Sequence, residues 1–123
     1  FANYEIDFAA EPGVDRLNEE QIVGVYRIVQ ELLNNASKHA KASKVTMRLT
    51  GGGQRIRFSY SDDGVGIDLA SLEGSFQHMG IAGIEKRVQS LEGEVRFRSA
   101  PGQGFHVDVS FPQCAAEKQG EER

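Results

Sequence analysis

Glu31, Asn35 and Lys38 recur at spacings of four and three residues, which bring side chains to the same face of a helix. An amide oxygen is a suitable Mg²⁺ ligand where waters and phosphates supply the other ligands, and a lysine can pair with those phosphates. A carboxylate one turn earlier can orient or deprotonate a nucleophile, or contact the water shell of the metal. Charged rows on helices are usually only solvated. The adjacent Asn34 favours the chemical interpretation, because asparagine is seldom placed mid-helix for stability.

A second candidate is the loop Asp62-Asp-Gly-Val-Gly66, which directly follows an apolar strand. Gly64 and Gly66 allow the backbone to turn sharply and to approach a flat ligand closely. A buried carboxylate at Asp62 could accept a hydrogen bond from an exocyclic amine such as that of adenine. The competing interpretation is a plain turn, because Asp-Gly is a common turn dipeptide.

Two further glycine segments could serve the same ligand. Gly80-Ile-Ala-Gly83 begins the second helix, where free backbone N–H groups can form a phosphate-binding site. The alternative is a flexible entry to that helix. Gly102-Gln-Gly104 is interpreted first as a hairpin turn, unless the other loops prove functional.

The first helix must position the polar residues. Asn18 and Gln21 have the spacing of a capping box and predict a helix from about residue 19 to 40. We expect Glu31, Asn35 and Lys38 to lie beside its core stripe rather than in it. That stripe comprises Ile22, Val25, Val29, Leu32, Leu33, Ala36 and Ala40.

The remaining pattern predicts strands on either side of a second helix. A half-buried strand is expected around 4–8, and strands at 45–49 and 56–60 are joined by a glycine hairpin at 51–53. A helix at 81–91 should stop at Gly93, and strands follow at 95–97 and 105–111, with His106 facing solvent. The order predicts an α+β fold (an α/β sandwich), in which both helices cover one face of a mixed five-stranded sheet.

Composition narrows the class of protein. The 123 residues fit one domain, expected at 1–112 with a disordered tail at 113–123. A net charge of −4 argues against a nucleic-acid partner, and the single Cys114 suits a reducing cytosol. No apolar stretch is long enough to span a membrane, so we expect a cytoplasmic fragment without membrane contact. Phe1 in place of Met indicates an excised piece, and the parent protein could still be membrane-bound. Neither a P-loop signature nor zinc-like spacing is present.

Taken in order, the segments resemble a known family. Glu31-Leu-Leu-Asn-Asn-Ala-Ser-Lys-His-Ala40 resembles the N box of the Bergerat-fold (GHKL) ATPases, and Asp62-Asp-Gly-Val-Gly-Ile67 resembles their G1 box. Gly80-Ile-Ala-Gly-Ile-Glu-Lys-Arg-Val88 is similar to the G2 region, and Pro101-Gly-Gln-Gly104 to the last glycine box. The resemblance runs from about residue 4 to 112. Four boxes in order are specific, where one would not be.

Within that fold the chain resembles sensor histidine kinases of the NarX, DesK and VraS type. Tyr26-Arg-Ile-Val-Gln-Glu31 before the N box, the Lys38-His39-Ala40 ending and the short lid favour this subgroup. The resemblance implies that ATP and Mg²⁺ bind here and that the γ-phosphate passes to a histidine on a separate dimerisation domain. Relay to a response regulator of the NarL/LuxR type would follow.

The resemblance also implies roles for single residues. Asn35 would coordinate Mg²⁺, Lys38 would contact the phosphates, His39 would pack near adenine and Asp62 would read its amine. Glu31 occupies the general-base position of gyrase-like relatives. Backbone or pocket roles fall to Gly64, Gly66, Gly80, Gly83, Gly102 and Gly104. Phe105 departs from the family pattern, which usually has Thr there.

Other functions remain open at this point. A gyrase- or MutL-like ATPase would use Glu31 to activate water, but a longer lid and a following domain would be expected. An anti-sigma serine kinase would not favour the Lys38-His39-Ala40 ending. A non-catalytic adaptor could keep the fold without using ATP. None of His39, His78 and His106 lies in the acidic helical context of a phosphoacceptor, so we expect the isolated chain to bind ATP without autophosphorylating.

Overall fold

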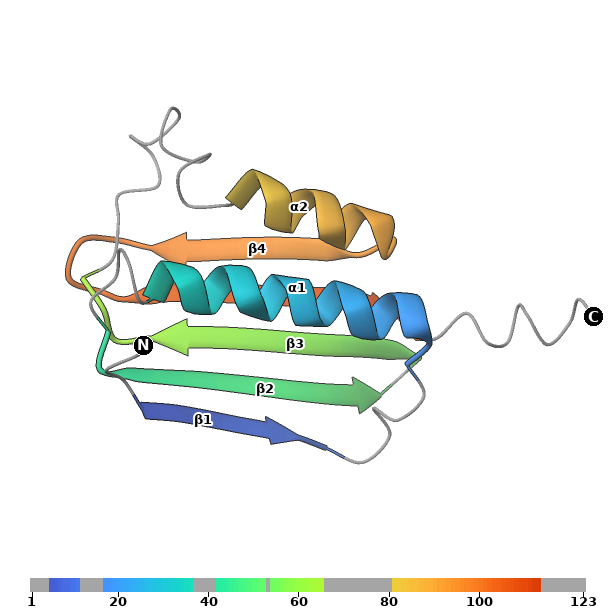
Figure 1. Ribbon diagram of the computed structural model, residues 1–123, viewed down its shortest axis with the longest axis horizontal. Coiled ribbons are helices and arrows are strands. Elements are labelled where there is room, and N and C mark those ends of the chain that lie inside the picture. Colours follow the sequence, from blue (N-terminus) through green and yellow to red (C-terminus); the bar gives the residue numbers. More distant parts are fainter. Residues whose placement is uncertain (1–4, 12–16, 37–41, 53, 66–80, 114–123) are drawn as a thin grey trace, which may run out of the picture.

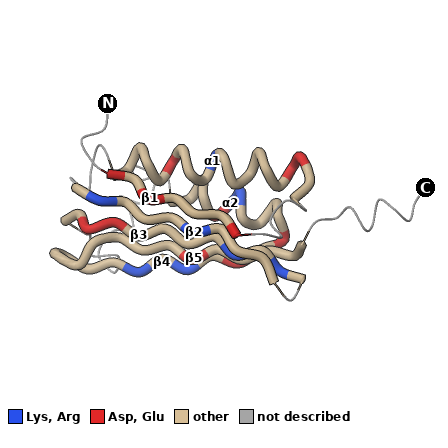
Figure 2. The backbone as a smooth tube through the Cα atoms, turned by 90° about the horizontal axis from the view of Figure 1, so that it is seen from below, with Lys and Arg blue, Asp and Glu red and all other residues tan. Residues whose placement is uncertain are grey.

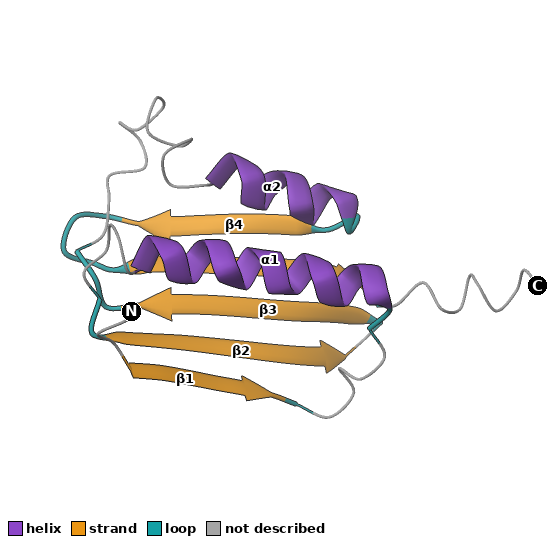
Figure 3. Ribbon diagram, viewed as in Figure 1, coloured by secondary structure: helices purple, strands orange, loops and turns teal. Residues whose placement is uncertain are grey.

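The computed structural model describes residues 5–11, 17–36, 42–52, 54–65 and 81–113. Five strands form one mixed sheet in the order β1-β2-β3-β5-β4. Both helices lie on the same face of that sheet, α1 over its middle and α2 beside α1 towards β4 (Figures 1 and 3). The expected two-layer α+β architecture is confirmed.

The strand register follows from alternating apolar and polar residues. β1 (Glu5–Ala10) runs parallel to β2 (Lys44–Gly52), and β2 forms an antiparallel hairpin with β3 (Arg55–Asp62). β5 (Phe105–Pro112) pairs antiparallel with β3 and with β4 (Glu94–Ser99). Because successive side chains point to opposite faces, the apolar set of each strand lies on the helix side.

Helix α1 spans Glu19–Asn35 and begins with the expected capping box. The Asn18 side chain accepts a hydrogen bond from the backbone N–H of Gln21 at 2.8 Å, and the Gln21 side chain accepts one from that of Asn18 at 3.1 Å. Gln21 also donates from Nε2 to the Pro112 carbonyl at 3.0 Å. The cap therefore fixes the helix start to the end of β5 as well. Residues 37–40 of the longer expected helix lie outside the described residues.

The buried face of α1 differs from the expected stripe. Ile28, which we had not assigned to the stripe, is 1% exposed, whereas Ile22 is 53% exposed. Val25, Leu32 and Ala36 are buried as expected. The period of 3.6 residues fits two adjacent stripes, and only packing against the sheet decides between them.

The expectation of a half-buried first strand was wrong. Ile6 and Phe8 are in register with the buried Val45 and Met47 of β2, and so lie on the helix side of the sheet. They are nevertheless 46% and 51% exposed, because neither helix extends over this edge of the sheet (Figure 1). Strand periodicity shows which side chains share a face but does not show whether that face is covered.

Helix α2 (Ile81–Ser90) ends close to the expected position, but by a different device. Glu92, with φ of 62°, adopts the left-handed conformation that Gly93 was expected to supply. The Gly93 N–H donates back to the Val88 carbonyl at 2.9 Å. A Cβ on Gly93 would lie 2.4 Å from the Ser110 carbonyl oxygen, so glycine is needed there for close contact with β5.

Candidate functional site

Four of the segments singled out in the sequence meet at one end of the domain. The C-terminal ends of α1 and β3, the N-terminal end of α2 and the turn between β4 and β5 all lie on the left in Figure 1. The sheet order explains this, because β3 and β5 are neighbours and run in opposite directions. The Asp62 loop, which follows β3, therefore lies beside the turn that precedes β5.

Asp62 is a buried carboxylate, 5% exposed, at the end of β3. Its Oδ2 accepts a hydrogen bond from the Tyr60 hydroxyl at 2.6 Å, and its Oδ1 accepts one from the Gly64 N–H at 2.9 Å. Two donors from the same segment thus fix the carboxylate orientation. Each oxygen keeps a further lone pair that can accept a hydrogen bond from a ligand.

Gly104 is held against the same residue. Its φ is +76°, and a Cβ there would lie 2.1 Å from the Asp62 carbonyl oxygen. Gly102, with φ of +77°, donates from its N–H to the Val65 carbonyl at 2.6 Å. The turn that was first interpreted as a simple hairpin therefore packs against the loop after β3 and braces it.

Phe105, the departure from the family pattern, belongs to the core. It is 4% exposed and pairs across the sheet with Asp62. Its ring makes an edge contact with Tyr60 at a centroid separation of 6.4 Å and a tilted contact with Phe97 at 6.2 Å. Tyr60 thus contacts both the Asp62 carboxylate and the Phe105 ring. The buried aromatic side chains therefore help to hold this carboxylate in place.

Asp63 has a structural role that the sequence analysis missed. Its Oδ1 accepts hydrogen bonds from the backbone N–H groups of Ser43 and Lys44 at 2.8 and 3.0 Å, and its Oδ2 accepts one from the Ser43 hydroxyl at 2.7 Å. These donors, the Ser43 hydroxyl first, lower the pKa of Asp63 from 3.8 to about 2. The hairpin register could have revealed this clamp, because a turn near residue 53 places residue 63 opposite residue 44.

Asn35 is buried, with 3% of its surface exposed, although it was expected beside the core rather than in it. It lies at the last position of α1, at the end of the domain that also holds Asp62 (Figure 1). A burial this complete is costly for an amide unless it is hydrogen-bonded, and among the described residues no buried side-chain polar atom lacks a hydrogen-bond partner. The neighbouring Asn34 is exposed.

Glu31 lies one turn before Asn35 and faces α2. It lines a cavity of about 380 Å³ between the two helices, together with Gly83 and the cations Arg27, Lys86 and Arg87. The structure therefore places Glu31 and Gly83 in the cavity between the helices. A separate cluster around the loop after β3 contains Asp62, Gly64, Gly102 and Gly104.

Four expected site residues, Lys38, His39, Gly66 and Gly80, lie outside the described residues, as does most of the tail from 113 to 123. Gln113 itself donates its N–H to the Gln54 carbonyl at 2.8 Å. Within the described ranges, no group of three or more His, Cys, Asp or Glu side chains could hold a metal ion. No helix in the part of the chain that the structure describes is long and apolar enough to cross a membrane.

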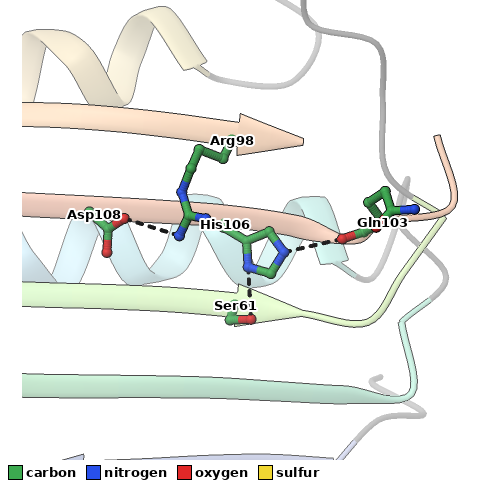
Figure 4. A network of polar contacts seen from close by, with 5 residues as sticks. All are labelled: Ser61, Arg98, Gln103, His106 and Asp108. Carbon is green, nitrogen blue, oxygen red and sulfur yellow. Dashed lines mark hydrogen bonds and ion pairs between the residues drawn. The ribbon is translucent and has the colours of Figure 1, made fainter. Parts of the chain in front are cut away.

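His106 lies on the helix-free face of the sheet, as expected (Figure 4). Its Nε2 is 3.1 Å from the Gln103 carbonyl and its Nδ1 is 3.0 Å from the Ser61 hydroxyl. A carbonyl can only accept, so Nε2 carries the proton, and in the neutral ring Nδ1 accepts from Ser61. Both ring nitrogens are thus engaged in holding the turn onto β3.

Comparison with known proteins identifies the family of this chain. Residues 20–115 match the family of histidine kinase-, DNA gyrase B- and HSP90-like ATPases. The chain is 38% identical over 95 residues to the sensor histidine kinase ComP of Bacillus subtilis, covering 77% of this chain and 12% of ComP. It is 33% identical over 108 residues to DegS of Brevibacillus brevis, a signal transduction histidine-protein kinase/phosphatase, covering 87% and 27%.

A third relative and a solved structure extend this result. The nitrate/nitrite sensor protein NarX of Escherichia coli K12 is 30% identical over 91 residues, covering 74% of this chain and 15% of NarX. The blue-light activated histidine kinase EL346 of Erythrobacter litoralis has the same fold, with a TM-score of 0.74, 21% identity, and 96% and 38% of the two chains covered. This chain therefore spans only a small part of its curated relatives. It belongs to the histidine kinase-, DNA gyrase B- and HSP90-like ATPases and is a histidine kinase ATPase domain of the kind found in sensor kinases.

Proposed function

We propose that this domain binds ATP with Mg²⁺ and presents the γ-phosphate to a histidine on a separate helical dimerisation domain of its parent kinase. The observation that carries the proposal is the buried carboxylate of Asp62, oriented by Tyr60 and Gly64 at the end of the domain where α1 ends and α2 begins. Membership of the ATPase family supports nucleotide binding. The nucleotide, metal and acceptor roles of single residues are our inference.

The proposal assigns adenine recognition to Asp62. An exocyclic amine is a donor, and the carboxylate oxygens are acceptors already held in place by Tyr60 and Gly64. A base that presents a carbonyl at that position would bring two acceptors together and would be rejected. Gly64 carries no side chain beside the carboxylate, so a flat ring can approach the backbone there.

The phosphate end is assigned to α1 and α2. Asn35 would offer its amide oxygen to Mg²⁺, alongside oxygens of the triphosphate and waters. Lys38 and the backbone at Gly80 and Gly83 would contact the phosphates, since the start of a helix favours negative charge. When bound, the metal would supply charge neutralisation. The residues of this chain hold and orient the donor.

Phosphoryl transfer depends mainly on positioning and on electrostatic stabilisation. Glu31 projects into the cavity between the helices, one turn from Asn35, where it could orient the receiving group or a water of the metal shell. The acceptor histidine is assigned to the parent kinase outside this chain. Onward transfer to a response regulator of the NarL/LuxR type would complete the pathway.

Nucleotide titration of the intact chain with and without Mg²⁺ tests the proposal. We expect ATP and ADP to bind, and Mg²⁺ to strengthen ATP binding. Asn35→Ala should lose most of that Mg²⁺ effect, whereas Asn34→Ala, an exposed neighbour in the same helix, should keep it. Circular dichroism should confirm that both variants are folded, because Asn35 is buried. No nucleotide binding by the wild type, or an unchanged Mg²⁺ effect in folded Asn35→Ala, would defeat the site assignment.

A further inference from the structure

The helix-free face of the sheet carries an excess of positive charge that the proposed nucleotide site does not use. Strand alternation places six basic residues on the outer surface of β2, β3 and β4, and only two acidic residues accompany them on the four strands from β2 to β4. We call this surface the basic face; it comprises Lys44, Arg48, Arg55, Arg57, Arg96 and Arg98, with Glu94 and Asp108.

This concentration opposes the charge of the whole chain. The chain has 14 Lys and Arg against 18 Asp and Glu. The basic face takes six of the former and two of the latter, so the remainder of the chain is strongly acidic. Figure 2 views the sheet edge-on from below, and most of its blue segments lie in the sheet layer. Glu5 and Asp7 of β1 border the face on one side.

Much of this positive charge has no local counter-ion. Arg98 pairs with Asp108 at 3.4 Å, with both side chains more than half exposed (Figure 4). Arg55 donates to the Ser110 hydroxyl at 3.1 Å, which leaves its charge uncompensated. Among the residues that the structure describes, Arg48, Arg57 and Arg96 form no ion pair. In the strand register Arg48 and Arg57 are diagonal neighbours on β2 and β3, whereas Arg96 lies directly opposite Asp108.

The face also has a definite shape. A hollow of about 510 Å³ lies over the central strands. Its charged and polar lining comprises three arginines, two carboxylates and small hydroxyl side chains: Arg48, Arg57, Arg96, Glu94, Asp108, Thr50, Ser59 and Ser110. The register places Arg48, Ser59, Asp108 and Arg96 in one row across the sheet. Arg48 and Arg96 are three strand spacings apart, or roughly 14 Å. An α-helix, which is about 10–12 Å across, matches that width.

We propose that the basic face docks an acidic α-helix of a protein partner, with Arg48 and Arg96 contacting carboxylates on its two flanks. Arginine pairs with carboxylates through two parallel N–H groups, and the serine and threonine hydroxyls between the rims can accept or donate. A membrane surface or a nucleic acid fits less well. Such extended polyanions would also meet Glu5 and Asp7 at the edge of the face.

Binding of a defined probe tests this proposal. The probe is a fluorescent, hydrocarbon-stapled alanine–glutamate helix of about 20 residues, which is ~30 Å long. A peptide of the same composition, unstapled and interrupted by proline, serves as its non-helical control. We expect the stapled helix to bind the intact chain at low salt and to weaken as salt rises, because exposed charges are screened over ~10 Å at 0.1 M. The non-helical peptide should bind several-fold more weakly.

Charge-reversal variants locate the contact. Arg48→Glu with Arg96→Glu should weaken helix binding by about tenfold or more, because two attractive contacts become repulsive. Arg27→Glu with Lys86→Glu changes the net charge equally on the helix side and should alter the affinity by less than about twofold. Equal weakening by both pairs, no binding of the stapled helix, or tighter binding to phosphatidylglycerol vesicles or to a DNA duplex would each overturn the proposal. These exposed sites leave the core intact, and circular dichroism checks folding.

Discussion

The proposed recognition of adenine depends on the Asp62 carboxylate, which accepts hydrogen bonds from the Tyr60 hydroxyl and the Gly64 N–H. In Asp62→Asn, one carboxylate oxygen is replaced by an amide NH₂, which cannot accept a hydrogen bond. A hydrogen bond to a charged acceptor contributes ~1.5–3 kcal/mol, so ATP affinity should fall about tenfold to a hundredfold. Calorimetric titration measures the change. Asp108→Asn, on the opposite face of the sheet, is the matched control and should bind ATP normally.

Affinity for ATP that survives intact in a folded Asp62→Asn variant would remove Asp62 from base recognition. A second measurement separates recognition from folding, because the wild type should prefer adenine nucleotides over guanine nucleotides. If Asp62 reads the exocyclic amine, the substitution should reduce this preference as well as the affinity. A purely structural role would weaken both nucleotides alike.

The lowered pKa of Asp63 predicts that the stability of the folded domain depends on pH. Its pKa is lowered from 3.8 to about 2 by the hydroxyl and backbone donors of Ser43 and Lys44. A depressed folded-state pKa gives stability that is present above the unfolded value, near pH 4, and is lost as pH falls towards 2. In Asp63→Asn the free energy of unfolding should therefore vary less between pH 4 and pH 2 than in the wild type. Urea unfolding at several pH values in that window measures the slopes, and identical slopes would contradict the clamp.

At the scale of elements, two glycines in one turn provide a controlled comparison. Gly102 and Gly104 both have φ near +77°, but only Gly104 lies against the Asp62 carbonyl. Gly102→Ala should cost about 1–2 kcal/mol for the left-handed backbone alone. Gly104→Ala should add ~1–3 kcal/mol of steric strain and should also weaken ATP binding, because the backbone at Asp62 must shift.

Thermal unfolding and ATP titration of the two glycine variants give the result. Equal destabilisation of both, with ATP affinity retained in Gly104→Ala, would show that the contact with Asp62 has no consequence for the site. The comparison is informative because both variants carry the same conformational penalty. Only the close approach differs between them.

The buried face of α1 can be tested in the same manner. Ile28→Ala should destabilise the domain by about 2–5 kcal/mol, because the side chain is fully enclosed by the core. Ile22→Ala, the same substitution six residues earlier at an exposed position, should cost about 0.5 kcal/mol or less. Chemical denaturation of the two variants measures both values. A larger loss for Ile22 would restore the stripe expected from periodicity.

Elements were predictable from the sequence where one local signal decides them. The capping box fixes the start of α1, and alternation with glycine turns fixes the strands of the β2–β3 hairpin. Burial was less predictable, because it depends on what packs above an element. Periodicity alone could not show that Ile28 is enclosed or that β1 is left uncovered.

The same limit applies to the candidate site. The position of Asp62 in the chain was evident, but its support by Tyr60 depends on strand alternation that brings residues 60 and 62 to one face. The Asp63 clamp depends on the hairpin register, and the Gly104 contact on the pairing of β3 with β5, which no local pattern encodes. Long-range strand pairing was thus the missing information in both cases.

At the scale of the whole molecule, we have proposed that this chain binds ATP while the acceptor histidine belongs to another domain. The isolated chain should therefore bind ATP without phosphorylating itself. The acceptor is assigned to a different domain, and His106 has both ring nitrogens engaged with Ser61 and Gln103. Incubation with γ-labelled ATP and Mg²⁺ should leave no alkali-stable, acid-labile label on the chain at times when nucleotide binding is saturated. His106→Ala should be equally unlabelled and should bind ATP with wild-type affinity. Stoichiometric label that disappears on replacing His39, His78 or His106 would place the acceptor within this chain and would contradict the proposed transfer between domains.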